Sequence, residues 1–201
     1  MAGAICAALR ERGESVAVFK PVVTGLDEPD GKWPPDHELL ATVAGGDPDV
    51  VAPYRFGPPV SPHYAAELAG AAIEPARLVE AARAARGTLV CEGVGGLMVP
   101  LTPGYLVRDL AVDLGLPVVI AARTGLGTIN HCLLTVEAAR AAGLHLAGIV
   151  MTPWPEVPEP IELSNRATVE RLAGVPVSGL PTTTPDGLAD AGRSLPLEDW
   201  L

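Results

Sequence analysis

The chain has 201 residues, of which 48% are hydrophobic and 19% are charged, and its net charge is -10 at neutral pH. This length suffices for one α/β domain with its own core, and so much apolar sequence excludes a disordered protein. The negative net charge argues against nucleic acid or an anionic membrane as a partner, because both attract basic protein surfaces. Small molecules are therefore the expected partners.

The sequence carries no targeting signal that we recognise. No apolar run reaches the roughly 18 residues of a membrane-spanning helix, and residues 1–10 lack the basic leader and cleavage site of a signal peptide. We therefore expect a cytoplasmic protein. Cys6, Cys91 and Cys132 are odd in number and far apart, so neither a disulfide framework nor a structural zinc site is indicated.

Helical periodicity alternates along the chain with short apolar strands. This pattern predicts an α/β fold with a mostly parallel sheet and helices on both faces. We expect the whole chain, 1–201, to form a single domain. The elements predicted in its first half are a helix over 1–12 that stops at Gly13, a strand over 15–19, helices over 36–44, near Ala65 and over 75–86, and a strand over 87–91.

The second half continues the alternation of strands and helices. A proline-rich stretch, 151–160, is expected to be a loop, because proline cannot donate to a strand ladder. The predicted elements are strands over 117–121, 146–150 and 175–180 and helices over 128–142 and 161–173.

Polar groups follow two of the predicted strands directly. Lys20, one of only two lysines, follows the first strand, and Glu92 follows the strand over 87–91 and opens the glycine-rich turn 92–96. The carboxyl ends of parallel strands gather ligands, and a glycine loop lets the backbone approach a phosphate. The pair indicates phosphate chemistry. Lys32 follows a glycine but precedes Trp33, so it does not form a Walker A motif.

Five segments, in order and with sensible gaps, resemble the dethiobiotin synthetases over nearly the whole chain. They are Val18-Phe-Lys-Pro-Val-Val-Thr-Gly25, Asp36-His-Glu-Leu-Leu40, Ser61-Pro-His63, Val90-Cys-Glu-Gly-Val-Gly-Gly-Leu97 with its continuation to Leu101, and Leu126-Gly-Thr-Ile-Asn-His131. The resemblance implies a P-loop NTPase-like fold. It also implies a ligase that makes a cyclic urea from 7,8-diaminopelargonate, CO2 and ATP with Mg²⁺, through a carbamate and a carbamic-phosphoric anhydride.

The same resemblance assigns charged residues to catalysis and metal binding. It places Lys20 beside the carbamate and the moving phosphoryl group, where an ammonium offsets developing charge; the alternative is a lysine that merely lies at a strand end. It makes Asp36 and Glu92 ligands of Mg²⁺, which prefers carboxylate oxygen. Asp36 could instead be a helix N-cap, whereas a carboxylate directly after an apolar strand needs a compensating cation or donor.

The resemblance also implies that the backbone of Gly93, Val94 and Gly95 lies close to the nucleotide. Thr152 occupies the position at which family members that recognise adenine have an asparagine. One hydroxyl cannot reproduce the paired donor and acceptor of a side-chain amide. The sequence therefore leaves open which nucleotide base the protein prefers. A later turn aligns weakly with a loop near the base, and its residues are Pro181, Thr182 and Thr183.

On the substrate side, the resemblance makes Thr24 a hydroxyl residue that helps to hold the diamine, although a lone threonine is also a common turn residue. It places Gly127, Thr128 and Asn130 at the start of a helix at a homodimer interface, where backbone amides meet the partner's substrate carboxylate. The alternative is that Thr128 and Asn130 simply cap that helix.

The family's first strand and Walker A loop are expected immediately before Met1 and are missing here. Either Met1 is an internal methionine, or the chain is a remnant that has lost efficient turnover of ATP. The second explanation leads to another function, a non-catalytic nucleotide-like domain for binding or regulation. A third possibility is an amidotransferase-linked synthetase, but none of the three cysteines has the setting of a glutamine-hydrolysing nucleophile.

Overall fold

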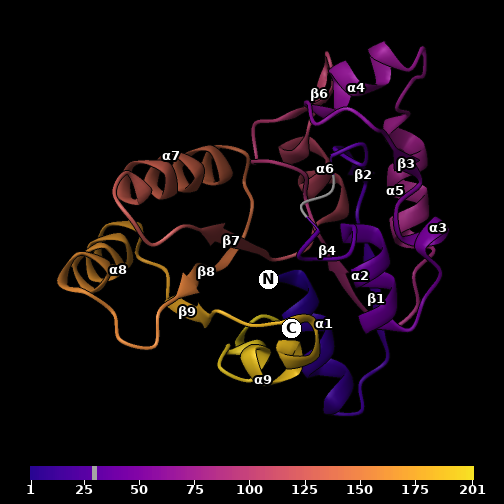
Figure 1. Cartoon of the computed structure of the whole chain (residues 1–201). Coiled ribbons are helices and arrows are strands. Elements are labelled where there is room, and N and C mark those ends of the chain that lie inside the picture. The colour runs from indigo at the N-terminus through magenta and orange to yellow at the C-terminus, as the bar shows by residue number, and fades with distance from the viewer. Residues whose placement is uncertain (29–30) are drawn as a thin grey trace.

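Parallel strand pairs form the framework of the fold (Figure 1). Strand β1 (Val16–Phe19) pairs with β4 (Thr88–Cys91), and β7 (Val118–Ala122), β8 (Leu146–Trp154) and β9 (Val177–Pro181) form a second sheet in that order. Every pairing in these two sheets is parallel, which confirms the α/β prediction. The strands do not form one continuous sheet, however, because β4 and β7 are the inner edges of two separate halves.

The computed structural model describes residues 1–28 and 31–201. Around the two half-sheets lie helices α1 (Ala2–Glu11), α2 (Asp36–Ala44), α3 (Pro48–Val51), α4 (Pro62–Leu68), α5 (Pro75–Arg83), α6 (Val107–Leu114), α7 (Thr128–Ala141), α8 (Pro160–Ala173) and α9 (Leu188–Gly192). The minor strands are β2 (Val22–Val23) and β3 (Tyr54–Arg55), which pair in parallel, and the antiparallel hairpin β5 (Pro100–Thr102) and β6 (Tyr105–Leu106). No helix within the described ranges is long and apolar enough to cross a membrane.

Helices cover both faces of the three-stranded half-sheet. In β8, Ile149 and Met151 belong to a buried cluster with α7 and α8, whereas Val150 between them belongs to a cluster with α1 and α9. This is the period-two alternation of a strand that is buried on both sides. The predicted arrangement of helices on both faces is thus confirmed.

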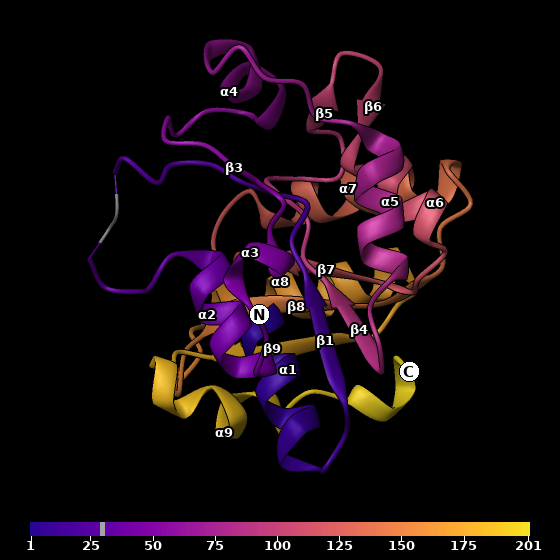
Figure 2. The ribbon, with the colours of Figure 1, turned by 90° about the vertical axis from the view of Figure 1, so that its right-hand side faces the viewer.

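Helix α1 is shared by the two half-sheets (Figure 2). Its Leu9 is fully buried in the cluster that includes β8 and β9, while Cys6 packs with Val18 of β1. Complete burial of a leucine contributes about 2 kcal/mol. The helix therefore packs against two half-sheets that form no strand pairing with each other within residues 1–28 and 31–201.

Strand β8 continues to Trp154 and does not end at Val150 as predicted. The expected loop was wrong for residues 151–154, because Met151 pairs with Gly179 and Trp154 pairs with Pro181 of β9. The register shifts between these two pairs, which leaves Pro153 at a bulge where its missing N–H costs little. Tertiary pairing here overrides the local signal of proline.

Candidate functional site

Lys20, Asp36 and Glu92 come together in the folded chain. The Lys20 side chain is buried, with 5% of the residue exposed, and its Nζ lies 2.5 Å from Glu92 Oε1 and 2.8 Å from Asp36 Oδ2. Both carboxylates remain partly exposed to solvent. One cation and two anions leave this cluster with a formal charge of -1.

The strand register places Lys20 beside Glu92. Phe19 and Cys91 are the last paired residues of β1 and β4, and the Glu92 N–H donates to the Phe19 carbonyl at 2.8 Å. The next residues of the two strands are therefore neighbours. The Lys20 N–H donates in turn to the Val51 carbonyl at 2.9 Å, which fixes the backbone where β1 ends.

Asp36 reaches the cluster from helix α2. It is the first residue of that helix, whose N-cap is Pro35 and which has no side-chain cap hydrogen bond. The alternative that Asp36 caps the helix is therefore wrong, and its carboxylate binds Lys20. A carboxylate in the first turn is also favoured by the helix dipole.

The two carboxylates stabilise the charged form of Lys20. Burial by itself would lower the pKa of Lys20, but the charges of Glu92 and Asp36 and their hydrogen bonds outweigh it, so the pKa lies above its usual value. The lysine is consequently a fixed cation at neutral pH. It suits electrostatic stabilisation and does not suit a role as a general base.

Asp36 and Glu92 also match a site for Mg²⁺. Within residues 1–28 and 31–201, no group of three or more acidic, histidine or cysteine side chains could surround a metal ion. Magnesium is commonly bound by only one or two carboxylates together with phosphate oxygens and water. Two partly exposed carboxylates next to each other fit that requirement, provided that a polyphosphate supplies the remaining oxygens.

A cavity of about 860 Å³ opens beside Lys20 and Glu92. It is lined by β4, by residues 118–121 of β7, by parts of α1 and α6, and by the C-terminal residues Leu197, Trp200 and Leu201. Its volume lies in the upper part of the range for small-molecule sites. Lys20, Glu92, Gly93, Gly95 and Thr152 are among the residues that line it.

The glycine loop after β4 presents its backbone to this cavity. Gly95 has φ +66°, and a Cβ at this position would lie 2.9 Å from Val99 Cγ2, so only glycine fits without strain. Val94, in contrast, packs its side chain against the core cluster that contains Phe19 and Leu110. If Val94 contacts a nucleotide, it does so through its backbone.

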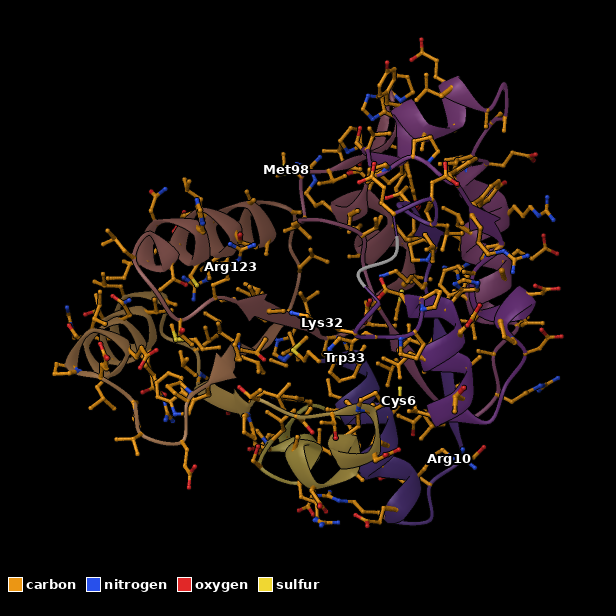
Figure 3. The ribbon with its side chains drawn as sticks, in the orientation of Figure 1. Cys6, Arg10, Lys32, Trp33, Met98 and Arg123 are labelled. Atoms are coloured by element: carbon orange, nitrogen blue, oxygen red, sulfur yellow. The ribbon has the colours of Figure 1, made fainter. Side chains whose placement is uncertain are left out.

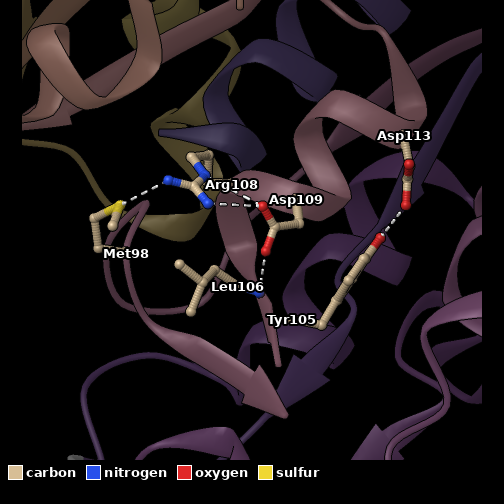
Figure 4. A network of polar contacts seen from close by, with 6 residues as sticks. All are labelled: Met98, Tyr105, Leu106, Arg108, Asp109 and Asp113. Atoms are coloured by element: carbon tan, nitrogen blue, oxygen red, sulfur yellow. Dashed lines mark hydrogen bonds and ion pairs between the residues drawn. The ribbon is translucent and has the colours of Figure 1, made fainter. Parts of the chain in front are cut away.

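The segment after the glycine loop is fastened to the start of α6. The Arg108 N–H donates to the Leu97 carbonyl at 2.8 Å. Asp109 accepts from the Leu106 N–H at 2.8 Å and from the Arg108 guanidinium at 3.0 Å (Figure 4). The Leu106 hydrogen bond, with a smaller contribution from Arg108, holds the pKa of Asp109 below its usual value. These hydrogen bonds connect the end of the glycine loop to the start of α6. The sequence analysis did not predict them.

The predicted substrate residues do not line the cavity. Thr24, Gly127, Thr128 and Asn130 are not part of its lining. The N-cap of α7 is Gly127 and has no side-chain cap bond, so the alternative that Thr128 and Asn130 cap this helix is wrong. The Thr128 hydroxyl turns inward and donates to the carbonyl of Arg123, which Figure 3 labels near α7.

The predicted base-side residues lie on two adjacent strands, β8 and β9, and in the segment directly after β9. Thr152 of β8 lines the cavity, whereas Pro181 at the end of β9 pairs with Trp154. Thr182 is exposed, and the Thr183 hydroxyl donates to the neighbouring Thr184 carbonyl. The structure therefore brings only Thr152 of this group to the cavity.

Parallel strands with a buried lysine, a carboxylate and a glycine loop at their carboxyl ends, and a second carboxylate from helix α2 beside them, are typical of a nucleotide-dependent α/β enzyme of the P-loop NTPase type. In agreement, a family profile described as AAA domain matches residues 2–182. Proteins named dethiobiotin synthetase are 40–45% identical to this chain over most of its length, and the chain therefore belongs to the dethiobiotin synthetase family.

The relatives that support this assignment are named ATP-dependent dethiobiotin synthetase BioD. The protein of Mycobacterium avium (strain 104) is 45% identical over 175 residues, which cover 83% of this chain and 74% of the relative. That of Anaeromyxobacter dehalogenans (strain 2CP-C) is 41% identical over 177 residues, 86% of this chain and 78% of the relative. That of A. dehalogenans (strain 2CP-1) is 40% identical over 200 residues, 97% and 88% of the two chains.

Proposed function

We propose that the chain is an ATP-dependent dethiobiotin synthetase that closes a cyclic urea on 7,8-diaminopelargonate. The observation that carries the proposal is the cluster of Lys20, Asp36 and Glu92 beside a cavity that Lys20 and Glu92 line, in a chain of this family. One substrate amine reacts with CO2 to form a carbamate. The carbamate oxygen then attacks the γ-phosphorus of ATP and ADP leaves. The second amine attacks the carbamoyl carbon, and phosphate leaves as the ring closes.

Lys20 supplies charge stabilisation for the phosphoryl transfer. Its ammonium is permanently charged and is held by Asp36 and Glu92 at the end of β1, so it need not reorganise as negative charge grows on the transferring oxygens. The same two carboxylates would hold Mg²⁺, which supplies charge neutralisation on the polyphosphate when bound. Gly93 and Gly95 let the backbone pass near the nucleotide.

The divided sheet supports the proposal that a further strand belongs to the active enzyme. The facing edges of β4 and β7 both line the cavity, and the apolar side chains of Ile5 and Leu9 form part of its lining. One parallel strand between these edges would join the halves and would end near Lys20. The loop that follows such a strand would supply the backbone donors for the β- and γ-phosphates.

The substrate residues support a site that is shared in a homodimer. Gly127, Thr128 and Asn130 lie at the start of α7, outside the cavity that contains Lys20. We assign the backbone amides of Gly127 and Asn130 to the carboxylate of the diamine bound by a partner subunit, whereas the Thr128 N–H already donates to the Gly125 carbonyl at 3.2 Å. Thr24 contributes its hydroxyl on the side of its own subunit, and a cytoplasmic location agrees with all of these substrates.

The test is turnover by the gene product expressed with every in-frame codon upstream of Met1. Incubation with diaminopelargonate, bicarbonate, ATP and MgCl₂ should give dethiobiotin, detected by mass spectrometry, with one ADP for each product. Nucleotide binding without an effect of the diamine would instead identify a non-catalytic binding domain. Upstream codons that encode no strand and no glycine-rich loop ending in Gly-Lys-Thr would contradict the proposed additional strand.

A further inference from the structure

The turn between β7 and α7, residues 123–127, has little apolar packing of its own. Leu126 is 94% exposed, and Gly127 adopts φ +91°, a conformation that glycine takes without strain. Loops of this kind are usually mobile unless their backbone is tied down. The proposed function requires the amide of Gly127, at the end of this turn, to meet a carboxylate, so whatever holds the turn contributes to binding.

Two buried polar side chains hold the turn. Thr128, which is 4% exposed, donates its hydroxyl to the Arg123 carbonyl at 2.5 Å. Asn165 of α8, which is 7% exposed, donates its amide to the carbonyls of Thr124 at 2.9 Å and Gly125 at 3.2 Å. Three consecutive carbonyls are therefore bound from the interior, and the contacts of Asn165 span 41 and 40 residues of sequence.

The identity of the Asn165 donor follows from its partners. Carbonyl oxygens only accept, so the group that faces Thr124 and Gly125 must be the NH₂ of the side-chain amide. An aspartate has the same shape but would direct an acceptor at two acceptors. This makes a nearly isosteric test possible.

Fixing these carbonyls also fixes the adjacent N–H groups. In a planar trans peptide unit, the C=O and N–H point in opposite directions. With the carbonyls of residues 123–125 bound from the interior, the N–H groups of Thr124, Gly125 and Leu126 point away from Asn165 and Thr128. Within the described part of the chain, none of the three donates to a backbone or side-chain acceptor.

Outward N–H groups just before a helix form a site for an anion. They add to the partial positive charge at the start of α7, which is 14 residues long. We propose that Asn165 is a positioning residue that holds the 123–127 turn in the conformation that binds the substrate carboxylate. This inference rests on the proposed function and extends it to a residue of α8 that touches neither substrate nor nucleotide.

The test compares Asn165→Asp with Ser164→Asp in the active enzyme. Ser164 is the exposed neighbour on the same helix, so its substitution adds the same charge without a contact to the turn. We expect Asn165→Asp to raise KM for diaminopelargonate about tenfold while KM for ATP stays within about twofold, and we expect Ser164→Asp to change neither. Thr128→Val, which removes the hydrogen bond to the Arg123 carbonyl, should also raise KM for diaminopelargonate.

The methyl ester of diaminopelargonate separates positioning from general damage. The wild-type enzyme should bind the ester less tightly than the acid, and Asn165→Asp should weaken binding of the ester by less than about twofold, because the carboxylate contact is already lost. An equal loss for acid and ester would overturn the inference. If Asn165→Asp does not fold, binding of the acid and of the methyl ester is compared in Thr128→Val. An equal loss for both would again overturn the inference.

Failure of the inference differs from failure of the proposed function. A wild-type enzyme that forms no dethiobiotin contradicts the function itself. Normal turnover together with an unchanged KM in both Asn165→Asp and Thr128→Val contradicts only the positioning role.

Discussion

The ammonium of Lys20 lies 2.5 Å from the carboxylate of Glu92, although 72 residues separate them in the sequence. The contact exists because β1 and β4 are parallel partners that end in register. Each residue is the first after its strand, so a shift of one residue would turn one side chain to the opposite face of the sheet. The candidate site therefore depends on this register.

Removal of the Lys20 charge should abolish most of the turnover. Lys20→Ala is expected to lower kcat by about 10²- to 10³-fold, because a fixed charge near the transferring phosphoryl group contributes on that scale. The measurement is ADP release coupled to dethiobiotin formation, with thermal unfolding as the check on folding. Arg171→Ala, which removes an exposed positive charge from α8, serves as the control. Unchanged turnover in Lys20→Ala would remove the catalytic assignment.

Glu92→Gln should raise the magnesium requirement. The substitution removes one of the two carboxylates and leaves Lys20 paired with Asp36 alone. We expect the MgCl₂ concentration at half-maximal turnover to rise at least about tenfold, in keeping with the loss of a charged oxygen ligand. Glu156→Gln, in an exposed loop, should leave it unchanged. A variant that loses only thermal stability would show that the carboxylate is structural.

The thiols of Cys6, which is buried, and of Cys91, which is half-buried, should make the fold sensitive to alkali. Burial, with a smaller contribution from the charge of Glu92, raises the pKa of Cys6 to about 12 and that of Cys91 to about 12, from an ordinary value of 9.0. The unfolded chain therefore loses these protons first. The stabilising contribution is complete below about pH 9 and is lost as the pH rises from about 9 to about 12, by roughly 1.4 kcal/mol per pH unit for each thiol.

Urea unfolding at pH 8 and pH 10 measures this loss. The range avoids Lys20, whose raised pKa affects stability only above about its ordinary value of 10.5. The double variant Cys6→Ala/Cys91→Ala should show a smaller fall in stability between the two pH values than the wild type, whatever its absolute stability. An identical fall would show that other groups carry the alkaline sensitivity.

Thr152 should make the enzyme tolerant of the nucleotide base. Because one hydroxyl cannot supply both a donor and an acceptor to adenine, we expect kcat/KM for CTP or GTP to lie within about tenfold of the value for ATP. Thr152→Asn should increase the preference for ATP at least about tenfold. The comparison needs the three nucleotides at saturating diamine, and an unaltered preference in the variant would place base recognition elsewhere.

A mixed dimer should be more active at low diamine concentration than either parent. In a heterodimer of Lys20→Ala and Asn165→Asp chains, one site combines an intact Lys20 with an intact turn from the partner. If the turn serves the partner's substrate, turnover at low diamine should reach about half that of the wild type. Purification through two different affinity tags isolates the heterodimer. Activity no higher than in the Asn165→Asp parent would show that each turn serves its own subunit.

Local patterns predicted most of the regular structure. The helix predicted over 36–44 is α2 with the same bounds, since a proline precedes it and Gly45, at φ +71°, ends it. The helix over 128–142 ends one residue earlier, at Ala141. The hairpin β5–β6 and helix α6 were not predicted. Their boundaries depend on contacts such as that between Asp109 and Leu106, which are weak signals in the sequence alone.

The sequence by itself determined the alternation of strands and helices, the family resemblance and the polar residues that follow β1 and β4, because periodicity, turns and motifs are local properties. Only the tertiary structure decided that the strands divide into two halves, that β8 continues through Pro153, and that Asp36 binds Lys20 and does not cap its helix. It also revealed Asn165, whose contacts span 40 residues or more. Such features depend on which segments pack together, and that is fixed by the whole core and by no single segment.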